Sequence, residues 1–285
     1  MLTVLEVIKK TAEFFTAKGI ESPRLNAELL VGHALGLPRM QLYVQFERVL
    51  AEAEVTAIRE LVRRRGRHEP LQYILGTVDF YGLKLKADPR ALIPRPETER
   101  LVEILLERAG SEAPRRVLDL GTGTGAIALA LAQAWPAAAV TAVDVSAPAL
   151  ALAGENRAST GMEARVTLLE SDWFGAIPAE ARFDLIVSNP PYLSGAEWAQ
   201  AGAEVRDHEP NGALVAAEEG LAAARAILRA APSFLAPGAW LALETGAGQH
   251  RALAAAAAQT GWARTESLAD LTGRDRYLLA WPGTA

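Results

Sequence analysis

From residue 116 onward, the chain alternates short apolar runs with helix-like stretches. The strand-like residues 116–120 lead into a glycine-rich loop, a helical stretch that reaches about Trp135, and a second strand-like run at 139–143. A strand, a helix and a strand in this order give two parallel strands joined by a right-handed crossover. The pattern therefore predicts an α/β fold built on a parallel sheet.

The same alternation continues toward the C-terminus. Further strand-like runs lie at 166–169, 183–187, 240–243 and 277–280, separated mostly by alanine-rich helical stretches. An open, doubly wound, Rossmann-like sheet is the expected architecture. The charged residues 274–276 are expected at the tip of a final hairpin.

A glycine-rich loop separates the first strand of this sheet from its helix. The loop consists of Gly121, Thr122, Gly123, Thr124 and Gly125. Glycine lets a backbone approach a ligand closely, and the N-terminus of the following helix offers free N–H groups, so we expect a nucleotide-like ligand here. Together with Ala126, the glycines also satisfy the Gly-x-Gly-x-x-Ala pattern of dinucleotide sites, so a nicotinamide dehydrogenase stays open at this point.

Two acidic residues help to choose between these ligands. Asp144 ends the second strand, where its carboxylate is placed to bind ribose hydroxyls in either kind of site. Asp119 lies two residues before the first glycine. An acidic residue there is less expected in a dinucleotide site, but it suits S-adenosylmethionine, which has a methionine ammonium group and no pyrophosphate. Asp119 therefore favours S-adenosylmethionine.

The strand-like run 183–188 ends abruptly in Asn189-Pro190-Pro191-Tyr192. Each proline fixes φ near about −65° and lacks an N–H, so the chain forms a rigid corner there. The Asn189 side-chain oxygen and the Pro190 main-chain oxygen can converge on one planar –NH2 group, with the Tyr192 ring beside it. An amide or an exocyclic amine is the predicted substrate group. The alternative is an Asn-Pro pair that merely opens a loop.

The first 70 residues have a different pattern, with apolar residues at helical spacing. We expect a small N-terminal helical bundle. Its last helix ends in the arginine-rich residues 63–67, which form either a solvated helix end or a docking patch for an acidic or nucleic-acid-bound partner. Two β-type runs at 71–76 and 80–85 predict a hairpin linker over residues 71–90. The domain that carries the sheet would then span residues 91–285.

Composition limits the function classes. The net charge of −5 argues against a protein that coats nucleic acid with its whole surface. The absence of cysteine excludes disulfides and cysteine metal sites, and it suits a reducing cytosol. The long uncharged run 126–143 reads as a helix followed by a strand and not as a membrane span. His208 lacks the spacing of a metal motif, and we predict no metal site.

Several spaced motifs together resemble a known family. The segments 119–125 and 189–192, with Asp144, are similar to class I S-adenosylmethionine-dependent methyltransferases that methylate amino groups. Further stretches narrow the resemblance to the HemK/PrmC family, over nearly the whole chain: 72–76, 80–82, 93–99, 171–173, Glu209-Pro210 and Ala213-Leu214. Members of that family methylate class I peptide chain release factors on the glutamine of a Gly-Gly-Gln loop. One departure is segment 193–207, which matches no shared pattern.

The resemblance implies a role for each site residue. Residues 121–125 would hold the methionine part of S-adenosylmethionine, Asp144 its ribose, and Asp172 with Trp173 its adenine, with S-adenosylhomocysteine as the product. The substrate pocket would be formed by Asn189, Pro190, Pro191 and Tyr192. Catalysis would rest on Asn189, Pro190 and Tyr192, and Asn189 would also contact the cofactor.

Other functions remain open on the sequence alone. A nucleic-acid adenine N6-methyltransferase would need the same –NH2 cradle, and a ribosomal protein would be another glutamine target. The catalytic half has no long basic stripe of the kind that duplex binding needs, which favours a protein substrate. We expect a cytoplasmic monomer without nucleic-acid or membrane binding, whose helical domain recognises the release factor.

Overall fold

The computed structural model describes residues 2–283, which fall into two compact units. The first unit contains the chain up to Thr77 together with Gly202–His208. The second contains Val78–Ala201 and the chain from Glu209 onward. Segment 202–208 therefore folds with the N-terminal unit, although it is separated from that unit by more than a hundred residues of sequence.

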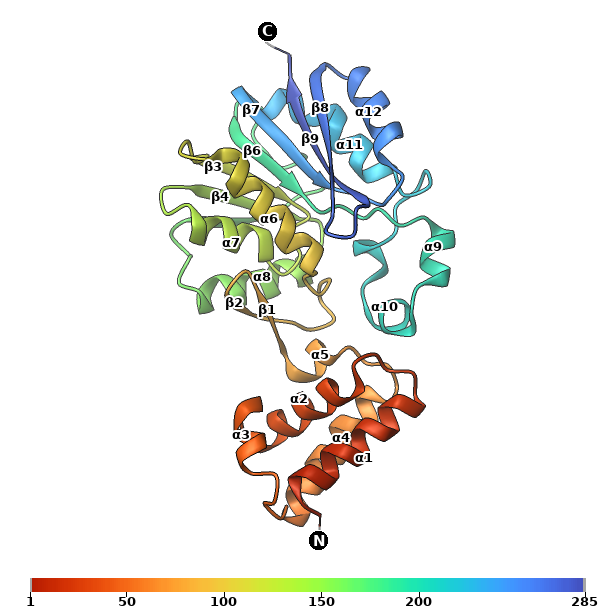
Figure 1. Cartoon of the computed structure of the whole chain (residues 1–285). Coiled ribbons are helices and arrows are strands. Elements are labelled where there is room, and N and C mark those ends of the chain that lie inside the picture. The colour runs from red at the N-terminus through yellow and green to blue at the C-terminus, as the bar shows by residue number, and fades with distance from the viewer. Residues whose placement is uncertain (1, 284–285) are drawn as a thin grey trace. The chain divides into compact units, whose positions relative to one another are not determined.

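The elements are coloured along the chain in Figure 1. The helices are α1 (Val4–Ala17), α2 (Pro23–Leu35), α3 (Arg39–Val44), α4 (Glu52–Arg65), α5 (Leu71–Leu75), α6 (Pro96–Ala109), α7 (Ala126–Ala134), α8 (Ala147–Ser159), α9 (Gly195–Gln200), α10 (Ala203–His208), α11 (Ala222–Ala230) and α12 (His250–Ala258), with 3-10 turns η1 (Asn211–Ala213) and η2 (Ala231–Phe234). The strands are β1 (Thr77–Phe80), β2 (Leu83–Lys86), β3 (Arg116–Leu120), β4 (Ala139–Asp144), β5 (Val166–Glu170), β6 (Phe183–Ser188), β7 (Leu235–Glu244), β8 (Trp262–Ala269) and β9 (Asp275–Pro282).

The N-terminal unit is a helical bundle, as the apolar spacing predicts. Helix α1 begins with a capping box, in which the Thr3 side chain accepts from Glu6 N–H and the Glu6 carboxylate accepts from Thr3 N–H. Its apolar residues share one buried cluster with those of α2 and α4, among them Phe15, Leu30 and Ile58. Packing of these apolar faces holds the helices together.

The expected strand at 71–76 is wrong, because Leu71–Leu75 is helix α5. Pro70 precedes the helix, and Gly76, at φ +74°, ends it in a left-handed conformation. Ile74 packs into the apolar cluster of the helical unit, and this packing overrides the β-propensity of the run. The hairpin is formed instead by β1 and β2.

The arginine-rich end of α4 is neutralised within its own unit. Arg63 pairs with Glu60, Arg64 with Glu69, and Arg65 with Glu204 of α10. The Arg65 side chain is only 5% exposed and also donates to Asn26 Oδ1 at 2.8 Å. These contacts do not support a free basic docking patch at these three arginines.

The second unit contains the predicted parallel sheet. Within residues 2–283, this sheet has seven strands in the order β5-β4-β3-β6-β7-β9-β8. The strands from β5 to β7 are parallel, whereas β9 pairs antiparallel with both β7 and β8. The final hairpin is therefore confirmed, but Asp275 and Arg276 belong to strand β9 and not to the tip.

Helices cover both faces of the sheet, as a doubly wound fold requires. Helices α6 and α7 bury their apolar side chains with Val117 and Leu185 on one face, and Phe80 and Leu85 of the hairpin join the same cluster. Helices α11 and α12 cover the opposite face (Figure 1). Alternate residues along each strand thus face two separate cores.

The middle of the sheet places the two main motifs side by side. Strands β3 and β6 are parallel neighbours, with Leu120 opposite Ser188 in the register. The next residues, Gly121 and Asn189, therefore leave the sheet at the same edge. Ligands of open α/β sheets bind in the crevice at this edge, where the strand order reverses.

None of the helices within residues 2–283 is long and apolar enough to cross a membrane.

Candidate active site

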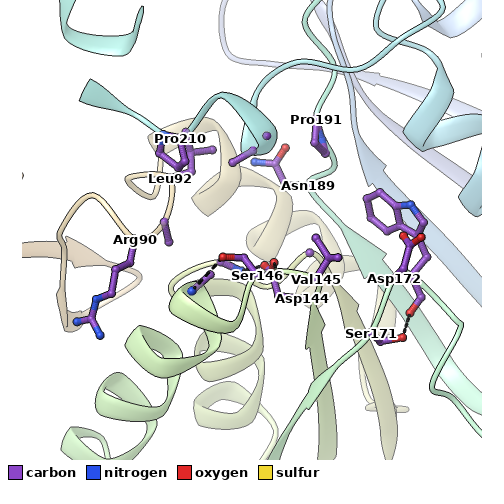
Figure 2. Close-up of a pocket in the computed structure, with 17 residues that line it drawn as sticks. Arg90, Leu92, Asp144, Val145, Ser146, Ser171, Asp172, Asn189, Pro191 and Pro210 are labelled. Carbon is purple, nitrogen blue, oxygen red and sulfur yellow. Dashed lines mark hydrogen bonds between the residues drawn. The ribbon is translucent and has the colours of Figure 1, made fainter. Parts of the chain in front are cut away.

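A cavity opens at the carboxyl edge of the sheet (Figure 2). Its walls come from the segments that follow β3, β4, β5 and β6, and from two further segments, 90–92 and 210–213. Figure 2 shows Asn189 and Pro191 on one side of this cavity, with Asp144 and Ser146 on another. The sequence motifs thus meet around one space, although they are far apart along the chain.

The three glycines of the loop after β3 have different structural roles. All have positive φ values, at +70° for Gly121, +57° for Gly123 and +84° for Gly125. Gly121 and Gly123 line the cavity, so their backbones face the ligand space. Gly125 does not line it. A Cβ there would lie 3.3 Å from the Leu129 side chain and 3.4 Å from Ala153 Cβ, so this glycine serves helix packing.

The two threonines of the loop are buried and also lie outside the cavity lining. Thr122 donates a 2.6 Å hydrogen bond to Asp119 Oδ2, and the main-chain oxygen of Thr124 accepts from Asn156 at 2.9 Å. The predicted binding of the cofactor by Thr122 and Thr124 stays a prediction. The contacts that they make are with the protein.

Asp144 ends β4 and lines the cavity. Its Oδ2 accepts from Gly123 N–H at 2.9 Å, and its Oδ1 accepts from Ser146 N–H at 2.9 Å. Each carboxylate oxygen still has accepting capacity, because a carboxylate offers about four lone-pair sites. Asp144 therefore shapes the loop and presents an acceptor to the cavity at once.

Asp119 lies beneath the loop and is fully buried. Its Oδ2 accepts from Thr122 Oγ1 and, at 3.2 Å, from Ala128 N–H, whereas its Oδ1 has no hydrogen-bond partner within residues 2–283. Burial, opposed by these hydrogen bonds and assisted by the charge of Asp144, raises the pKa of Asp119 to about 7. Asp119 does not line the cavity, so its observed role is to hold the loop against α7.

The segment after β5 supplies an aromatic wall. Asp172 and Trp173 both line the cavity. Trp173 has a left-handed backbone, at φ +48°, which Ser171 Oγ supports by donating to its carbonyl at 2.9 Å (Figure 2). The Trp173 ring lies near Gly121, where an added Cβ would be 3.7 Å from it. A flat aromatic wall beside a glycine backbone fits a nucleobase.

The corner after β6 contributes two of its four residues to the lining, Asn189 and Pro191. Pro190 and Tyr192 are not among the lining residues, so their predicted contact with the substrate stays a prediction. The Tyr192 hydroxyl donates to Glu244 Oε1 at 3.3 Å, and its main-chain oxygen accepts from Gln249 Nε2 at 2.9 Å. The corner is thus anchored from two directions.

Sequence reasoning missed a buried polar group behind Asn189. Thr98 Oγ1 accepts from Asn189 Nδ2 at 3.1 Å and donates to Glu244 Oε2 at 2.7 Å. Glu244, the last residue of β7, is 1% exposed. Burial, opposed mainly by the Thr98 hydrogen bond, raises the pKa of Glu244 to about 7. The signal available was Thr98 within the motif stretch 93–99.

A second missed feature is the wall formed by segments 90–92 and 210–213. Glu209 is buried, accepts from Ile93 N–H at 3.2 Å, and pairs with Arg95. This carboxylate thereby ties Pro210, which lines the cavity, to the segment before α6. The motif pair Glu209-Pro210 was the available signal, but no local pattern places it beside residue 93.

The residues that line the cavity fit S-adenosylmethionine. Asp144 offers an acceptor for ribose hydroxyls, Trp173 an aromatic wall for a base, and the glycines a close backbone. Arg90 is the only Lys or Arg side chain in the described lining, and its guanidinium pairs with Asp88 and Glu155 and points away from the cavity in Figure 2. A ligand without phosphate charge suits these walls. Among residues 2–283, no cluster of His, Asp and Glu is arranged to hold a metal.

Comparison with solved structures supports the fold. The chain is similar to a Thermus thermophilus 16S rRNA N2 G1207 methyltransferase, solved with AdoMet and guanosine, with a TM-score of 0.54 and 24% identity over 73% of this chain and 50% of that one. It is also similar to a methyltransferase from Pyrococcus furiosus, with a TM-score of 0.53 and 21% identity over 71% and 90% of the two chains. These likenesses show a shared methyltransferase fold.

Sequence relatives are more specific. Residues 6–76 match the PrmC N-terminal domain, and residues 97–206 match the methyltransferase small domain. A release factor glutamine methyltransferase from Geobacter sulfurreducens is 44% identical over 97% of this chain and 95% of its own, and one from Deinococcus radiodurans is 42% identical over 96% and 97%. Both domains and nearly the full length are therefore shared, and the chain belongs to the release factor glutamine methyltransferase family.

Proposed function

We propose that this enzyme transfers a methyl group from S-adenosylmethionine to the side-chain amide nitrogen of the glutamine in the Gly-Gly-Gln loop of class I peptide chain release factors. Family membership over nearly the whole chain supports the substrate. The single structural observation that carries the proposal is that Asn189, an amide acceptor on a proline-fixed corner, faces the same cavity as Asp144 and Trp173.

The residues that line the cavity suggest how each part of the cofactor would be held. Gly121 and Gly123 would lie against the methionine portion, Asp144 would accept from the ribose hydroxyls, and Asp172 with Trp173 would hold the adenine. When bound, S-adenosylmethionine supplies an electrophilic methyl group on its sulfonium. Asp119 would act on this site from beneath, by fixing the loop.

The substrate amide needs help from the protein because its nitrogen lone pair is delocalised into the carbonyl. Asn189 Oδ1 and the Pro190 carbonyl would each accept one of its two N–H bonds. These acceptors orient the nitrogen and offset the positive charge that grows on it as it is methylated. Pro191 and Tyr192 would complete the pocket.

Mass spectrometry of a purified release factor, incubated with the enzyme and S-adenosylmethionine, tests this function. We expect one methyl gain on the loop glutamine and none on a factor whose loop glutamine is replaced by asparagine. A ribosomal protein and an adenine-containing oligonucleotide, offered separately, test the two other target classes. Methylation of either one without methylation of the release factor would refute the proposal.

We also propose that the enzyme works as a cytoplasmic monomer that does not bind nucleic acid and uses its helical unit to recognise the release factor. The net charge of −5 and the internal pairing of Arg63, Arg64 and Arg65 support the absence of nucleic-acid binding. Light scattering of the purified protein tests whether it is a monomer. Gel shift with duplex and single-stranded RNA tests the absence of nucleic-acid binding.

A further inference from the structure

A chain of hydrogen bonds runs from the substrate-facing amide into the protein. Asn189 Nδ2 donates to Thr98 Oγ1 at 3.1 Å, and Thr98 Oγ1 donates to Glu244 Oε2 at 2.7 Å. The second carboxylate oxygen, Glu244 Oε1, accepts from the Tyr192 hydroxyl at 3.3 Å. The chain joins the corner after β6, the first turn of α6 and the end of β7. Thr98 and Glu244 do not line the cavity, and the hydrogen bond from Asn189 to Thr98 links them to it.

The chemistry of these groups fixes the direction of each bond. An ionised carboxylate only accepts hydrogen bonds, and a hydroxyl has a single proton to donate. Thr98 must therefore give its proton to Glu244 and turn a lone pair toward Asn189. Only the –NH2 end of the Asn189 amide can meet that lone pair, which leaves Oδ1 at the other end of the amide free.

We propose that Thr98 and Glu244 are positioning residues, which orient the Asn189 amide so that its Oδ1 accepts the N–H of the substrate glutamine. This inference rests on the proposed function, because it assigns a task to the acceptor used there. Without the two residues, nothing in the chain of bonds distinguishes the two ends of the Asn189 amide. A turned amide would present –NH2 to the –NH2 of the substrate, a donor against a donor.

The surroundings of Glu244 make this orientation sensitive to pH. Thr98 and Glu97 face Glu244 from α6, Arg276 and Tyr277 from β9, and Tyr192 from the corner. Burial is the largest influence and raises the pKa of Glu244 to about 7. Above that pH, the carboxylate compels Thr98 to donate to it. Below it, the carboxyl carries its own proton, and Thr98 is free to donate to Asn189 Oδ1 and turn the amide.

Variants at Thr98 separate positioning from packing. Thr98→Val keeps the shape of the side chain but removes both hydrogen-bonding capacities, and we expect kcat to fall about 10–100-fold with unchanged affinity for S-adenosylmethionine. Thr98→Ser restores the hydroxyl, and we expect it to restore kcat to within about threefold of wild type. Thr245→Val is the matched control. Thr245 is a fully buried threonine beside Glu244, and losing its hydroxyl should lower the melting temperature and leave kcat unchanged.

A second readout needs neither cofactor nor substrate. The chain has four asparagines, Asn26, Asn156, Asn189 and Asn211, so selective ¹⁵N labelling gives few side-chain amide signals in the full-length protein. The Asn189 pair is identified by its loss in Asn189→Ala. We expect its chemical shifts to titrate with a midpoint near the pKa of Glu244, about 7, and the titration to vanish in Glu244→Gln and in Thr98→Val.

The two measurements keep the inference apart from the proposed function. If the wild-type enzyme does not methylate a release factor but the Asn189 amide titrates as expected, the proposed function fails. The role of Thr98 and Glu244 in orienting the Asn189 amide then still stands. If the enzyme is active, yet Thr98→Val retains wild-type kcat or the Asn189 signals do not respond to Glu244, the positioning role is overturned.

Discussion

The backbone N–H of Gly123 donates a 2.9 Å hydrogen bond to Asp144 Oδ2, which joins the glycine loop after β3 to the end of β4. One carboxylate therefore sets the shape of the loop and stands at the cavity wall. This contact couples the parts of the cavity that we propose for the methionine and the ribose of the cofactor, so a change at Asp144 should affect both.

Asp144→Ala should weaken binding of S-adenosylmethionine. Losing a charged acceptor for ribose hydroxyls costs about 1.5–3 kcal/mol, which is roughly a 10–100-fold rise in Kd. Isothermal titration calorimetry measures the Kd of each variant for S-adenosylmethionine. Asp184→Ala is a matched control, because Asp184 also accepts from two backbone N–H groups, those of Arg115 and Arg116, but lies outside the cavity lining. Equal losses of affinity in both variants would mean that Asp144 acts through the fold alone.

Asn189→Ala should lower turnover and leave the affinity for S-adenosylmethionine nearly unchanged. An acceptor that matters most as charge develops on the substrate nitrogen is worth about 10²–10³ in kcat. Steady-state methylation of a release factor and calorimetry with S-adenosylmethionine give the two quantities. Asn211→Ala serves as the control, because Asn211 of η1 is exposed and, unlike Pro210 and Gly212 beside it, is not among the residues that line the cavity. Wild-type turnover in Asn189→Ala would remove the acceptor mechanism.

Much of the catalytic unit can be predicted because its signals are local. The strand runs, the glycine loop, Asp144 and the Asn189 corner each lie within a few neighbouring residues. The carboxyl ends of adjacent parallel strands then bring them together without further information. The fold prediction is confirmed for the same reason.

The parts that sequence could not provide depend on tertiary contacts. Thr98 and Glu244 meet across 146 residues, and nothing near Glu244 distinguishes a buried carboxyl from a solvated strand end. The run 71–75 has strand-forming residues but becomes helical because Ile74 packs in the helical core. Arg65 looked like a surface charge, and only the fold of segment 202–208 beside it reveals its partner Glu204.

Asp119→Asn should change how stability depends on pH. Burial raises the pKa of Asp119 from 3.8 to about 7, so the folded state binds a proton that the unfolded state releases. The stabilisation from this group is complete below the unfolded pKa and is lost as pH rises through about 7. The asparagine variant lacks this loss.

We therefore expect Asp119→Asn to gain roughly 1–3 kcal/mol relative to wild type between about pH 5 and pH 8. Urea unfolding at the two pH values, followed by tryptophan fluorescence, measures this gain. Because asparagine can still accept from Thr122 and Ala128, the loop and the cofactor affinity should persist. A difference between variant and wild type that is the same at both pH values would show that Asp119 does not titrate in this range.

Gly220→Ala should disturb the corner that carries Asn189. A Cβ on Gly220 would lie 2.1 Å from the Tyr192 carbonyl oxygen, so that carbonyl and its hydrogen bond from Gln249 must shift. A misplacement of this kind can cost on the order of 10²-fold in kcat. Gly248→Ala is the control, because Gly248 has a similar φ of +87° with nothing within 4 Å of its added Cβ. It should lose about 1 kcal/mol of stability and keep its kcat. Equal activities of the two variants would argue against the contact with Tyr192.

Removal of residues 1–77 should separate cofactor binding from recognition of the protein substrate. The unit that begins at Val78 contains the whole sheet, the cavity lining and the hairpin residues Phe80 and Leu85 in its own core, so residues 78–285 should fold and bind S-adenosylmethionine with unchanged affinity. A cut at residue 91 would remove these two buried side chains.

The same truncated enzyme should fail on an intact release factor. Specific docking of a protein needs an interface of about 1,200 Å² or more, and a short loop in the Asn189 pocket provides much less. A short peptide with the Gly-Gly-Gln sequence isolates the pocket from the rest of the interface, because it offers only the loop. We expect full-length and truncated enzymes to have similar kcat/KM for the peptide, and the full-length enzyme to be far better on the intact factor. Equal kcat/KM on the intact factor would eliminate the recognition role of the helical unit, whereas loss of activity on the peptide as well would show that this unit supports the catalytic site itself.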